Sequence, residues 1–496
     1  MFSYSAWADC PKVGTTYTCV SGSTETQISN AIAAASDGDT IHINAGTYNW
    51  GNNGLTINTA ESNLTIEGDG VGNTVVNSGG FYVYMTDNIR ITGFEFNISN
   101  SVVVNSVNGY LEAAILFEGC HDFRFDHNEV DKDEWAAPLG GIYAIGDYAT
   151  GKDSYGLIDN NTLINCRILS WGGWGGAPGS NDRWYDYGDS RGTKYNVFAE
   201  DNIVTVEAGT PGYPGYHCDE DGRVLCNFMD ANVGGGYVAR FNTITNSYFE
   251  HHPGSASNGR GTRNTEIYEN TLALTATFIG GFSRQFYFHG AGSGVVFENH
   301  SSQNFNNPGI HLDYNPDNDT RRNQCLAGGN SLDGNENVGL YKGYPCLDQL
   351  GVNHDNTLMS GSTNPGQVKQ PFYSWNNDQP NGELLWEPNR DGLFGVIYIE
   401  DRDFYATESS CTGTQTSGVC VGTWASRPTV CTEGVGYWAT DMGEWNSNSA
   451  GNDGALYVCN DSNTYVLNYT PYTYPHPLRG EAEVVPANAI QGVTIN

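Results

Sequence analysis

The stretch Gly236–Leu272, GYVARFNTITNSYFEHHPGSASNGRGTRNTEIYENTL, contains the same short pattern twice. Each copy, ARFNTI at Asn242 and EIYENT at Asn270, is a run of strand-forming residues that reaches an asparagine. A loop with several histidines and arginines separates the two copies. The repeat indicates the fold, and the loop is the first candidate for a functional site.

The strand-then-asparagine pattern recurs along the chain. It reads FRFDHN, GLIDNN, VFAEDN, VARFN, EIYEN and VVFEN, and its asparagines are Asn128, Asn161, Asn202, Asn242, Asn270 and Asn299. Their intervals of 33, 41, 40, 28 and 29 residues are too irregular for propeller blades, but they suit a coil whose turns accept insertions on one side. Stacked asparagines can hydrogen-bond to one another at tight turns. The pattern therefore predicts an all-β, right-handed parallel β-helix (a β-solenoid) with a structural asparagine column.

The two ends of the chain differ from the coil. TETQISNAIAAA, residues 24–35, is the clearest helical segment, with Thr24 as its N-cap, and we expect it to cover the open sheet edge. Near the other end, two cysteine pairs enclose glycine- and aromatic-rich loops between Cys411 and Cys459. We therefore divide the chain into an N-terminal cap at 1–45, a β-helix at 46–399, and a disulfide-stapled C-terminal cap or accessory domain with a tail at 400–496.

Several segments resemble those of the pectate-lyase-like β-helix repeat proteins. They are AIAAASDGDTIHINAGTYNW, FEFNIS, FDHNEV, GRGTRNTEIYENT and the C-terminal ATDMGEW with LYVCNDSNTYVLNYTPYTYPHPL. The resemblance extends from about Thr24 to Leu478 and implies mainly a fold, because the superfamily includes polysaccharide lyases, glycosidases and phage tailspikes. The subgroup that this chain is most similar to implies no particular activity.

The charge of the chain excludes some partners. A formal charge of −34 and only 22 Lys and Arg residues argue against binding to nucleic acid or to an anionic membrane, and favour a solvated acidic surface. No run of eighteen apolar residues predicts a membrane span, and the start, MFSYSAWADC, has no signal-peptide pattern.

Twelve cysteines form near pairs without any CxxC motif. The pairs are Cys10 with Cys19, Cys218 with Cys226, Cys325 with Cys346, Cys411 with Cys420, and Cys431 with Cys459, which leaves Cys120 and Cys166. Pairs around polar loops favour disulfides, and hence an extracellular or cell-surface protein, over a zinc site with clustered thiolates.

A column of charged residues lies two positions before the asparagines. It reads Asp126, Asp159, Glu200, Arg240, Tyr268 and Phe297. Parallel strands lie about 4.8 Å apart, so the carboxylates would be close enough to raise each other's pKa, as in acid/base pairs and metal sites. The alternative is a solvated polar ladder on the outside of the coil.

The loop region is less acidic than the rest of the chain. Between Ala231 and Val295 it has three glutamates, and its basic residues include Arg240, His252, Arg260, Arg263, Arg284 and His289. A region of neutral to positive potential can bind the carboxylate or sulfate of an acidic glycan. β-Elimination from a uronate needs a cation or donor to neutralise the carboxylate and a base to take the C5 proton. We select Arg240, His252, Arg260 and Arg263 as catalytic candidates, with Arg284 and His289 in substrate binding. Alternatively, the arginines pair with Glu266 and Glu269 and hold a loop in place.

Two further loops have binding patterns. SWGGWGGAPGSNDRWYDYGD presents Trp171, Trp174, Trp184, Tyr185 and Tyr187, which could stack on sugar rings or fold down over the coil. DYNPDND places Asp313, Asn315, Asp317 and Asp319 at alternate positions, like the start of a calcium loop, although Asn318 and Gln324 depart from the EF-hand pattern. Asp219, Glu220 and Asp221 form a weaker candidate, so Ca²⁺ is the cofactor to test.

The sequence thus favours a secreted β-helix protein that binds a polysaccharide and cleaves it as a lyase or a hydrolase, with an acidic glycan as the expected substrate. The competing interpretation is a non-catalytic extracellular protein, such as a filament subunit, an adhesin or a tailspike-like module. In either case, the C-terminal tail could pair with a neighbouring molecule.

Overall fold

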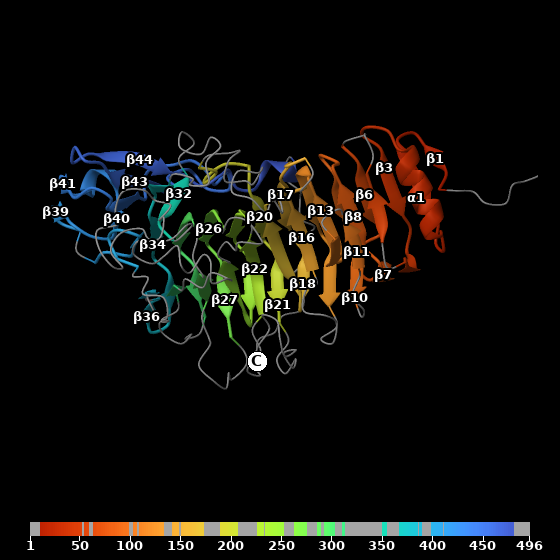
Figure 1. The fold of residues 1–496 in the computed structure, drawn as a ribbon, viewed down its shortest axis with the longest axis horizontal. Helices are drawn as coiled ribbons and strands as arrows, with labels where there is room; N and C mark the ends of the chain where they lie inside the picture. The colour runs from red at the N-terminus through yellow and green to blue at the C-terminus, as the bar shows by residue number, and fades with distance from the viewer. Residues whose placement is uncertain are drawn as a thin grey trace, which may run out of the picture.

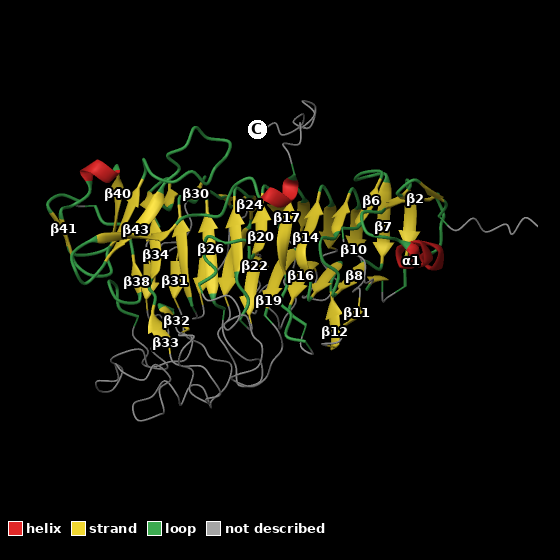
Figure 2. Cartoon of the chain, turned by 90° about the horizontal axis from the view of Figure 1, so that it is seen from above, coloured by secondary structure: helices red, strands yellow, loops and turns green. Residues whose placement is uncertain are grey.

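The computed structural model shows an elongated stack of short strands with one helix at its N-terminal end (Figures 1 and 2). The structure describes residues 10–51, 54–58, 63–98, 103–106, 109–132, 141–147, 150–172, 189–206, 226–232, 234–251, 262–274, 285–288, 292–302, 310–312, 350–354, 367–384, 386–388, 398–409 and 411–480. All structural statements below concern these residues.

The strands of the stack form three long sheets. The first sheet contains β1 (Lys12–Val13), β2 (Thr16–Cys19), β3 (Thr40–Ile43), β6 (Thr65–Gly68), β9 (Arg90–Thr92), β14 (His121–Asp126), β17 (Tyr155–Asp159), β20 (Val197–Glu200), β23 (Tyr237–Arg240), β26 (Asn264–Tyr268), β29 (Ser293–Phe297), β34 (Phe372–Trp375) and β38 (Phe404–Tyr405). The second contains β4 (Gly46–Asn49), β7 (Thr74–Ser78), β10 (Glu95–Ile98), β15 (Glu129–Lys132), β18 (Thr162–Ile164), β21 (Ile203–Thr205), β24 (Thr243–Thr245), β27 (Thr271–Ala273), β30 (His300–Ser301), β35 (Asp378–Gln379) and β36 (Gly382–Glu383). The third contains β5 (Leu55–Ile57), β8 (Phe81–Tyr84), β13 (Ile115–Glu118), β16 (Gly141–Ile145), β19 (Arg167–Trp171), β22 (Cys226–Asn232), β25 (Ser247–His251), β28 (Phe286–Phe288), β31 (Ile310–Leu312) and β37 (Trp386–Pro388).

Successive strands visit the three sheets in turn. Strands β14, β15 and β16 lie in the first, second and third sheets, and β17 returns to the first sheet beside β14. The pairs are parallel, except for β1 with β2 and β35 with β36 at the ends. This is the predicted all-β parallel β-helix, for which connections between parallel strands favour the right-handed sense.

The core fills the inside of the coil with stacked apolar side chains. In the third sheet, Ile142, Ile168, Met229 and Phe249 occupy one register position on neighbouring strands, and all four are buried. Aliphatic and aromatic residues repeat at each rung because one side of every strand faces the interior. This continuous core holds the turns of the coil in fixed positions.

The asparagine column is confirmed and gains a seventh member, Asn377. In each step the Nδ2 of one asparagine donates to the Oδ1 of the next, for example from Asn202 to Asn242 at 3.0 Å and from Asn299 to Asn377 at 2.8 Å. The backbone N–H of the lower asparagine donates to the same Oδ1. These bonds satisfy polar groups that are buried at the corner between the first and second sheets.

We expect Asn242→Ala to lower the free energy of unfolding by about 2–3 kcal/mol, because it deprives buried groups on two neighbouring rungs of partners. Asn242 donates to Asn270 and accepts from the backbone and side chain of Asn202. Urea unfolding measures the change. Thr243→Ala, at the exposed neighbour, serves as the control, with a change within about 0.5 kcal/mol; equal losses for both variants would contradict a structural column.

The helix α1 (Glu25–Ala34) lies at the N-terminal end of the stack (Figure 1). Thr24 caps it as predicted: its side chain accepts from the N–H of Gln27, whose side chain accepts from the N–H of Thr24. Ile28, Ala31 and Ile32 are its buried residues. Its role as a shield for the sheet edge stays a prediction.

Three of the predicted disulfides are confirmed: Cys10–Cys19, Cys411–Cys420 and Cys431–Cys459. Cys120 and Cys166 form no disulfide and are buried. Cys218, Cys325 and Cys346 lie outside the described residues, as does the side chain of Cys226, so the other two pairs stay predictions.

The C-terminal region folds against the first sheet. It contains β39 (Thr414–Gln415) paired with β41 (Val430–Cys431), and a sheet of β40 (Val419–Gly422), β42 (Gly436–Ala439), β43 (Ala455–Cys459) and β44 (Tyr465–Tyr469). The same region includes the 3-10 turn η1 (Trp424–Ser426). Short elements elsewhere are the antiparallel pairs β11 (Val103–Ser106) with β12 (Gly109–Glu112) and β32 (Val352–His354) with β33 (Gln367–Lys369). The predicted boundaries at 45 and 399 stay predictions.

An aromatic interface joins this region to the coil. Tyr268, Phe297 and Trp375 stack on neighbouring rungs of the first sheet, with ring centroids 4.6 and 4.5 Å apart. Trp438 covers the stack from the C-terminal sheet, 5.0 Å from Phe297, and Trp445 lies 5.6 Å from Tyr268. The outer face of the first sheet is therefore closed along these rungs.

Beyond β44, residues 470–480 run back along the first sheet toward the N-terminus, and we call them the C-terminal strap. In Figure 1 this dark-blue chain passes from β44 toward β17, and it ends in the 3-10 turn η2 (Pro477–Arg479). Arg240 donates to the carbonyls of Tyr472 and Thr473 at 2.5 and 2.8 Å. The strap is thus fixed by side chains of the coil.

Candidate active site

A row of outward-facing residues runs along the corner of the coil. It consists of the residue before each ladder asparagine: His127, Asn160, Asp201, Phe241, Glu269, Glu298 and Asn376, and we call it the corner row. Each has a left-handed backbone with φ between 51° and 57°, which turns the chain from the first sheet into the second. The ladder asparagine then points inward, so neighbouring members of the corner row lie one rung apart on the outside.

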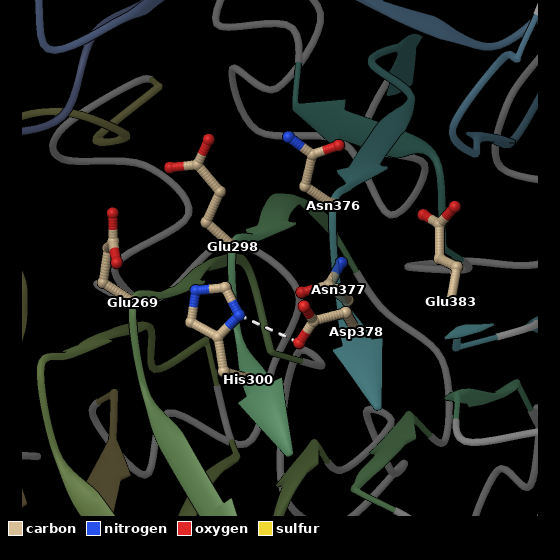
Figure 3. A pocket seen from close by; sticks show the side chains of 7 residues that line it. All are labelled: Glu269, Glu298, His300, Asn376, Asn377, Asp378 and Glu383. Carbon is tan, nitrogen blue, oxygen red and sulfur yellow. Dashed lines mark hydrogen bonds and ion pairs between the residues drawn. The ribbon is translucent and has the colours of Figure 1, made fainter. Parts of the chain in front are cut away.

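Three neighbouring members of the corner row, Glu269, Glu298 and Asn376, line a cavity of about 450 Å³ (Figure 3). His300, Asn377 and Asp378 from β30 and its neighbour β35, and Glu383 from β36, complete the lining. Among the described residues, four carboxylates and one imidazole surround this pocket, and no lysine or arginine of these ranges lines it.

Glu269 and Glu298 lie on neighbouring rungs of the corner row, because the residues before them, Tyr268 and Phe297, pair across β26 and β29. Burial, followed by the negative charge of Glu269, raises the pKa of Glu298 to about 7. Burial also raises the pKa of Glu269, while the hydrogen bond from Glu298 acts in the opposite direction. A carboxyl group whose pKa is raised to about 7 is still partly protonated at neutral pH, so Glu298 can serve as a proton donor there.

His300 and Asp378 lie beside this pair. Nδ1 of His300 is 2.9 Å from Oδ1 of Asp378, since strands β30 and β35 pair in parallel and place the two residues opposite each other. Their side chains are 53% and 59% exposed, so this side of the pocket is open to solvent.

Glu383 lies across the pocket from Glu269 and Glu298 (Figure 3). It accepts a hydrogen bond from the hydroxyl of Thr407, and burial raises its pKa. A protonated carboxyl on one side of a cavity and a second carboxyl on the other is the arrangement that general acid/base cleavage requires.

The predicted charged column is aligned as the sequence indicated. Asp126, Asp159, Glu200, Arg240, Tyr268 and Phe297 lie opposite one another on β14, β17, β20, β23, β26 and β29. The expectation of a solvated ladder is wrong, because the three carboxylates and Arg240 are fully buried. The C-terminal strap covers Glu200 and Arg240, which sequence spacing alone could not indicate.

Each carboxylate of the column has a guanidinium partner. Arg90 binds Asp126 at 2.8 Å, Arg124 binds Asp159 at 3.0 Å, and Arg240 binds Glu200 at 2.7 Å. The bonds from Arg90 and His127 outweigh burial and lower the pKa of Asp126 to about 2. The column is a set of buried ion pairs in this structure.

Of the arginines selected from the loop region, the structure describes Arg240 and Arg263, and both are buried. Arg240 pairs with Glu200, and the alternative in which the other arginines of the loop region hold it in place stays a prediction. Glu266 accepts from the N–H of Gly192 at 2.9 Å and from the hydroxyl of Tyr469 at 2.6 Å. Arg263 is 2% exposed, at the start of the segment that enters β26.

Most other predicted site residues lie outside the described residues. These are His252, Arg260, Arg284, His289, Trp174, Trp184, Tyr185, Tyr187, Asp313, Asn315, Asp317, Asp319, Asp219, Glu220 and Asp221. Trp171 is described and half-buried at the end of β19, and its ring is parallel to that of Tyr143 at 6.4 Å. Within the described ranges, no group of three or more His, Cys, Asp or Glu side chains is arranged to hold a metal ion. No helix among the described residues is long and apolar enough to cross a membrane.

The pocket was not selected from the sequence. The sequence nevertheless contains a pattern that indicates it, one position after the charged column. Glu269 and Glu298 directly precede Asn270 and Asn299, so aligning the asparagines places two glutamates on neighbouring rungs. Asn376, Asp378 and Glu383 were hidden, because 78 residues separate Asn299 from the next ladder asparagine.

The raised pKa of Glu298 predicts that acidification stabilises the folded state. Folded Glu298 keeps its proton up to about pH 7, whereas an ordinary glutamate releases it near 4.5, so the folded state binds more protons between these values. Its contribution is therefore present below about pH 4.5 and lost as the pH rises through 7, by roughly 1–3 kcal/mol. Urea unfolding at several pH values should show Glu298→Gln with a flatter decline than wild type; parallel curves would refute the shift.

No protein-family model matches the chain, and no curated protein matches it. Several solved structures are similar to the chain. They include a PL6 family polysaccharide lyase, Pedsa3628 from Pseudopedobacter saltans, at 12% identity over 79% of this chain and 91% of that chain, with a TM-score of 0.37. The PL6 family alginate lyase AlyGC matches at 11% identity over 93% of this chain and 57% of its own, with a TM-score of 0.32. A Geobacillus virus E2 protein, ORF18, matches at 13% identity over 56% of this chain and 54% of its own, with a TM-score of 0.23.

Proposed function

On this pectate-lyase-like parallel β-helix, we propose that the Glu269–Glu298 pocket cleaves a polysaccharide by acid/base hydrolysis. The observation that carries the proposal is the placement of these glutamates on neighbouring rungs of one open cavity, where burial and the charge of Glu269 raise the pKa of Glu298 to about 7. Perturbed carboxyl groups concentrate at catalytic sites because acid/base work needs a proton donor near the working pH.

Glu298 is the general acid. Its proton passes to the glycosidic oxygen as the bond from that oxygen to the anomeric carbon breaks. Glu383 is the base: it takes one proton from the water whose oxygen bonds to the anomeric carbon. Glu269, as a carboxylate, favours the protonated form of Glu298 between turnovers through its negative charge.

The charge of the pocket bears on the substrate. Its described lining has four carboxylates and, among these residues, only His300 as a basic group, so a uronate or a sulfated sugar would meet like charges there. This favours a neutral or amino-bearing sugar at the point of cleavage, in contrast to the acidic glycan expected from the loop arginines. The β-elimination proposed from His252 and Arg260 is the second candidate, favoured only by the composition of that loop.

A product assay separates these possibilities. The purified protein is incubated with xylan, chitosan, pectate, alginate and dextran sulfate, and both reducing ends and absorbance from unsaturated uronates are measured. Reducing ends without that absorbance support hydrolysis, whereas unsaturated products favour the lyase. If no polymer yields either product, the non-catalytic structural interpretation replaces both.

The location of the protein, its binding of calcium and its self-association belong to the same proposal. The three disulfides suit an extracellular or cell-surface location. Calcium binding at 313–319 is tested by adding a chelator, which should lower the melting temperature if the ion is structural. Self-association through the tail is tested by light scattering of the intact chain.

A further inference from the structure

The corner row is closed on the N-terminal side of the pocket. Phe241, one rung before Glu269, is stacked by Tyr474 of the strap with ring centroids 3.9 Å apart, and Trp445 lies 6.3 Å away. One rung further, Asp201 accepts from the hydroxyl of Tyr474 at 3.0 Å and from Nη2 of Arg479 at 2.5 Å. A sugar chain that occupied the pocket could not continue along these two rungs.

This barrier is anchored in the buried ion-pair column. Arg479 reaches Oε1 of Glu200 at 2.7 Å, and the N–H of His476 donates to the same oxygen at 3.0 Å. Arg240, which is fully buried, donates to two strap carbonyls. Because charged groups hold both the backbone and a side chain of the strap, its position at the pocket is fixed.

Two further segments border the pocket. At its C-terminal side, the N–H of Asn376 donates to Oγ1 of Thr407 at 3.2 Å, and that hydroxyl donates to Glu383, so the segment around Thr407 joins the β36 turn. Toward the first sheet, Trp438 and Trp445 of the C-terminal region cover the aromatic stack. The open side faces the second sheet, where His300 and Asp378 are more than half exposed.

We propose that this pocket accepts only the end of a glycan chain, so that the protein releases short products from chain ends. The inference rests on the proposed hydrolysis and adds its mode of action. A chain cut in its middle must continue past the site in both directions, whereas Tyr474 and Trp445 block the rung on the N-terminal side of the pocket. Tyr474 and Trp445 are the specificity-determining residues, because they occupy the rungs that an internal segment would need.

The wild-type protein tests this with the panel polymer that yields reducing ends. We expect reducing ends to increase while the viscosity of the polymer solution stays within a few per cent, with mono- or disaccharides as the earliest products. An early large fall in viscosity, with products of many lengths, would overturn the inference while leaving hydrolysis intact. Absence of any product from the whole panel would instead defeat the proposed function itself.

A variant tests the role of the strap. Tyr474→Ala removes the ring over Phe241 and is expected to permit internal cuts, seen as a several-fold larger viscosity fall per reducing end formed. Tyr472→Ala is the matched control: this ring packs on Phe198, 5.6 Å away, and the backbone carbonyl that binds Arg240 remains. A folded Tyr474→Ala protein with unchanged products, or equal changes in both variants, would contradict the barrier. If Tyr474→Ala does not fold, the wild-type viscosity result still decides.

Discussion

Glu298→Gln should lower kcat on the responsive polymer by about 10²–10⁴-fold, with a small change in KM. Glutamine keeps the shape of the side chain but cannot deliver a proton to the leaving oxygen. In the wild-type protein, kcat should fall as the pH rises above about 7, since burial and Glu269 raise the pKa of Glu298 to that value.

Glu269→Gln gives a complementary result. Without the negative charge and hydrogen bond of Glu269, the pKa of Glu298 should fall, and the alkaline limb of the kcat profile should move to lower pH. Glu444→Gln, at an exposed glutamate of the C-terminal region, is the control and should leave the profile unchanged. An unaltered profile in Glu269→Gln, or full activity in Glu298→Gln, would remove the pair from the chemistry.

Arg240→Ala should lower the free energy of unfolding by about 3–5 kcal/mol, the range for removal of one partner from a buried ion pair. The loss is large because Arg240 serves Glu200, Tyr268 and two carbonyls of the strap at once. In the Arg240→Ala variant, Arg479 would still neutralise part of the charge of Glu200. We therefore expect the loss in free energy of unfolding to stay within about 3–5 kcal/mol.

Chemical unfolding in urea measures this change, together with limited proteolysis of the strap. Arg427→Ala is the matched control: Arg427 lies over the ring of Trp424 at 3.8 Å near the surface, where such a contact contributes about 0.5–1 kcal/mol. A cost below about 1 kcal/mol for Arg240→Ala, with an intact strap, would show that the column is not a structural anchor.

The sequence by itself determined the coil. One strand-then-asparagine pattern predicted the parallel sheets, the hydrogen-bonded asparagines and the alignment of Asp126 with Asp159 and Glu200. It could do so because these features are local: the side-chain alternation of a strand and the turn before an asparagine repeat at every rung. Thr24 and the short-range cysteine pairs were predicted for the same reason.

Only the tertiary structure decided which face of the coil is open. The strap that buries Glu200 lies 276 residues further along the chain, and His300 and Asp378 of the pocket are 78 residues apart. No short-range periodicity records such contacts, because they depend on how long insertions and the C-terminal region fold back over the stack. The physical reason is burial: the C-terminal strap covers the charged column, whose residues form ion pairs, while two glutamates one position away line an open pocket in which the pKa of Glu298 is raised.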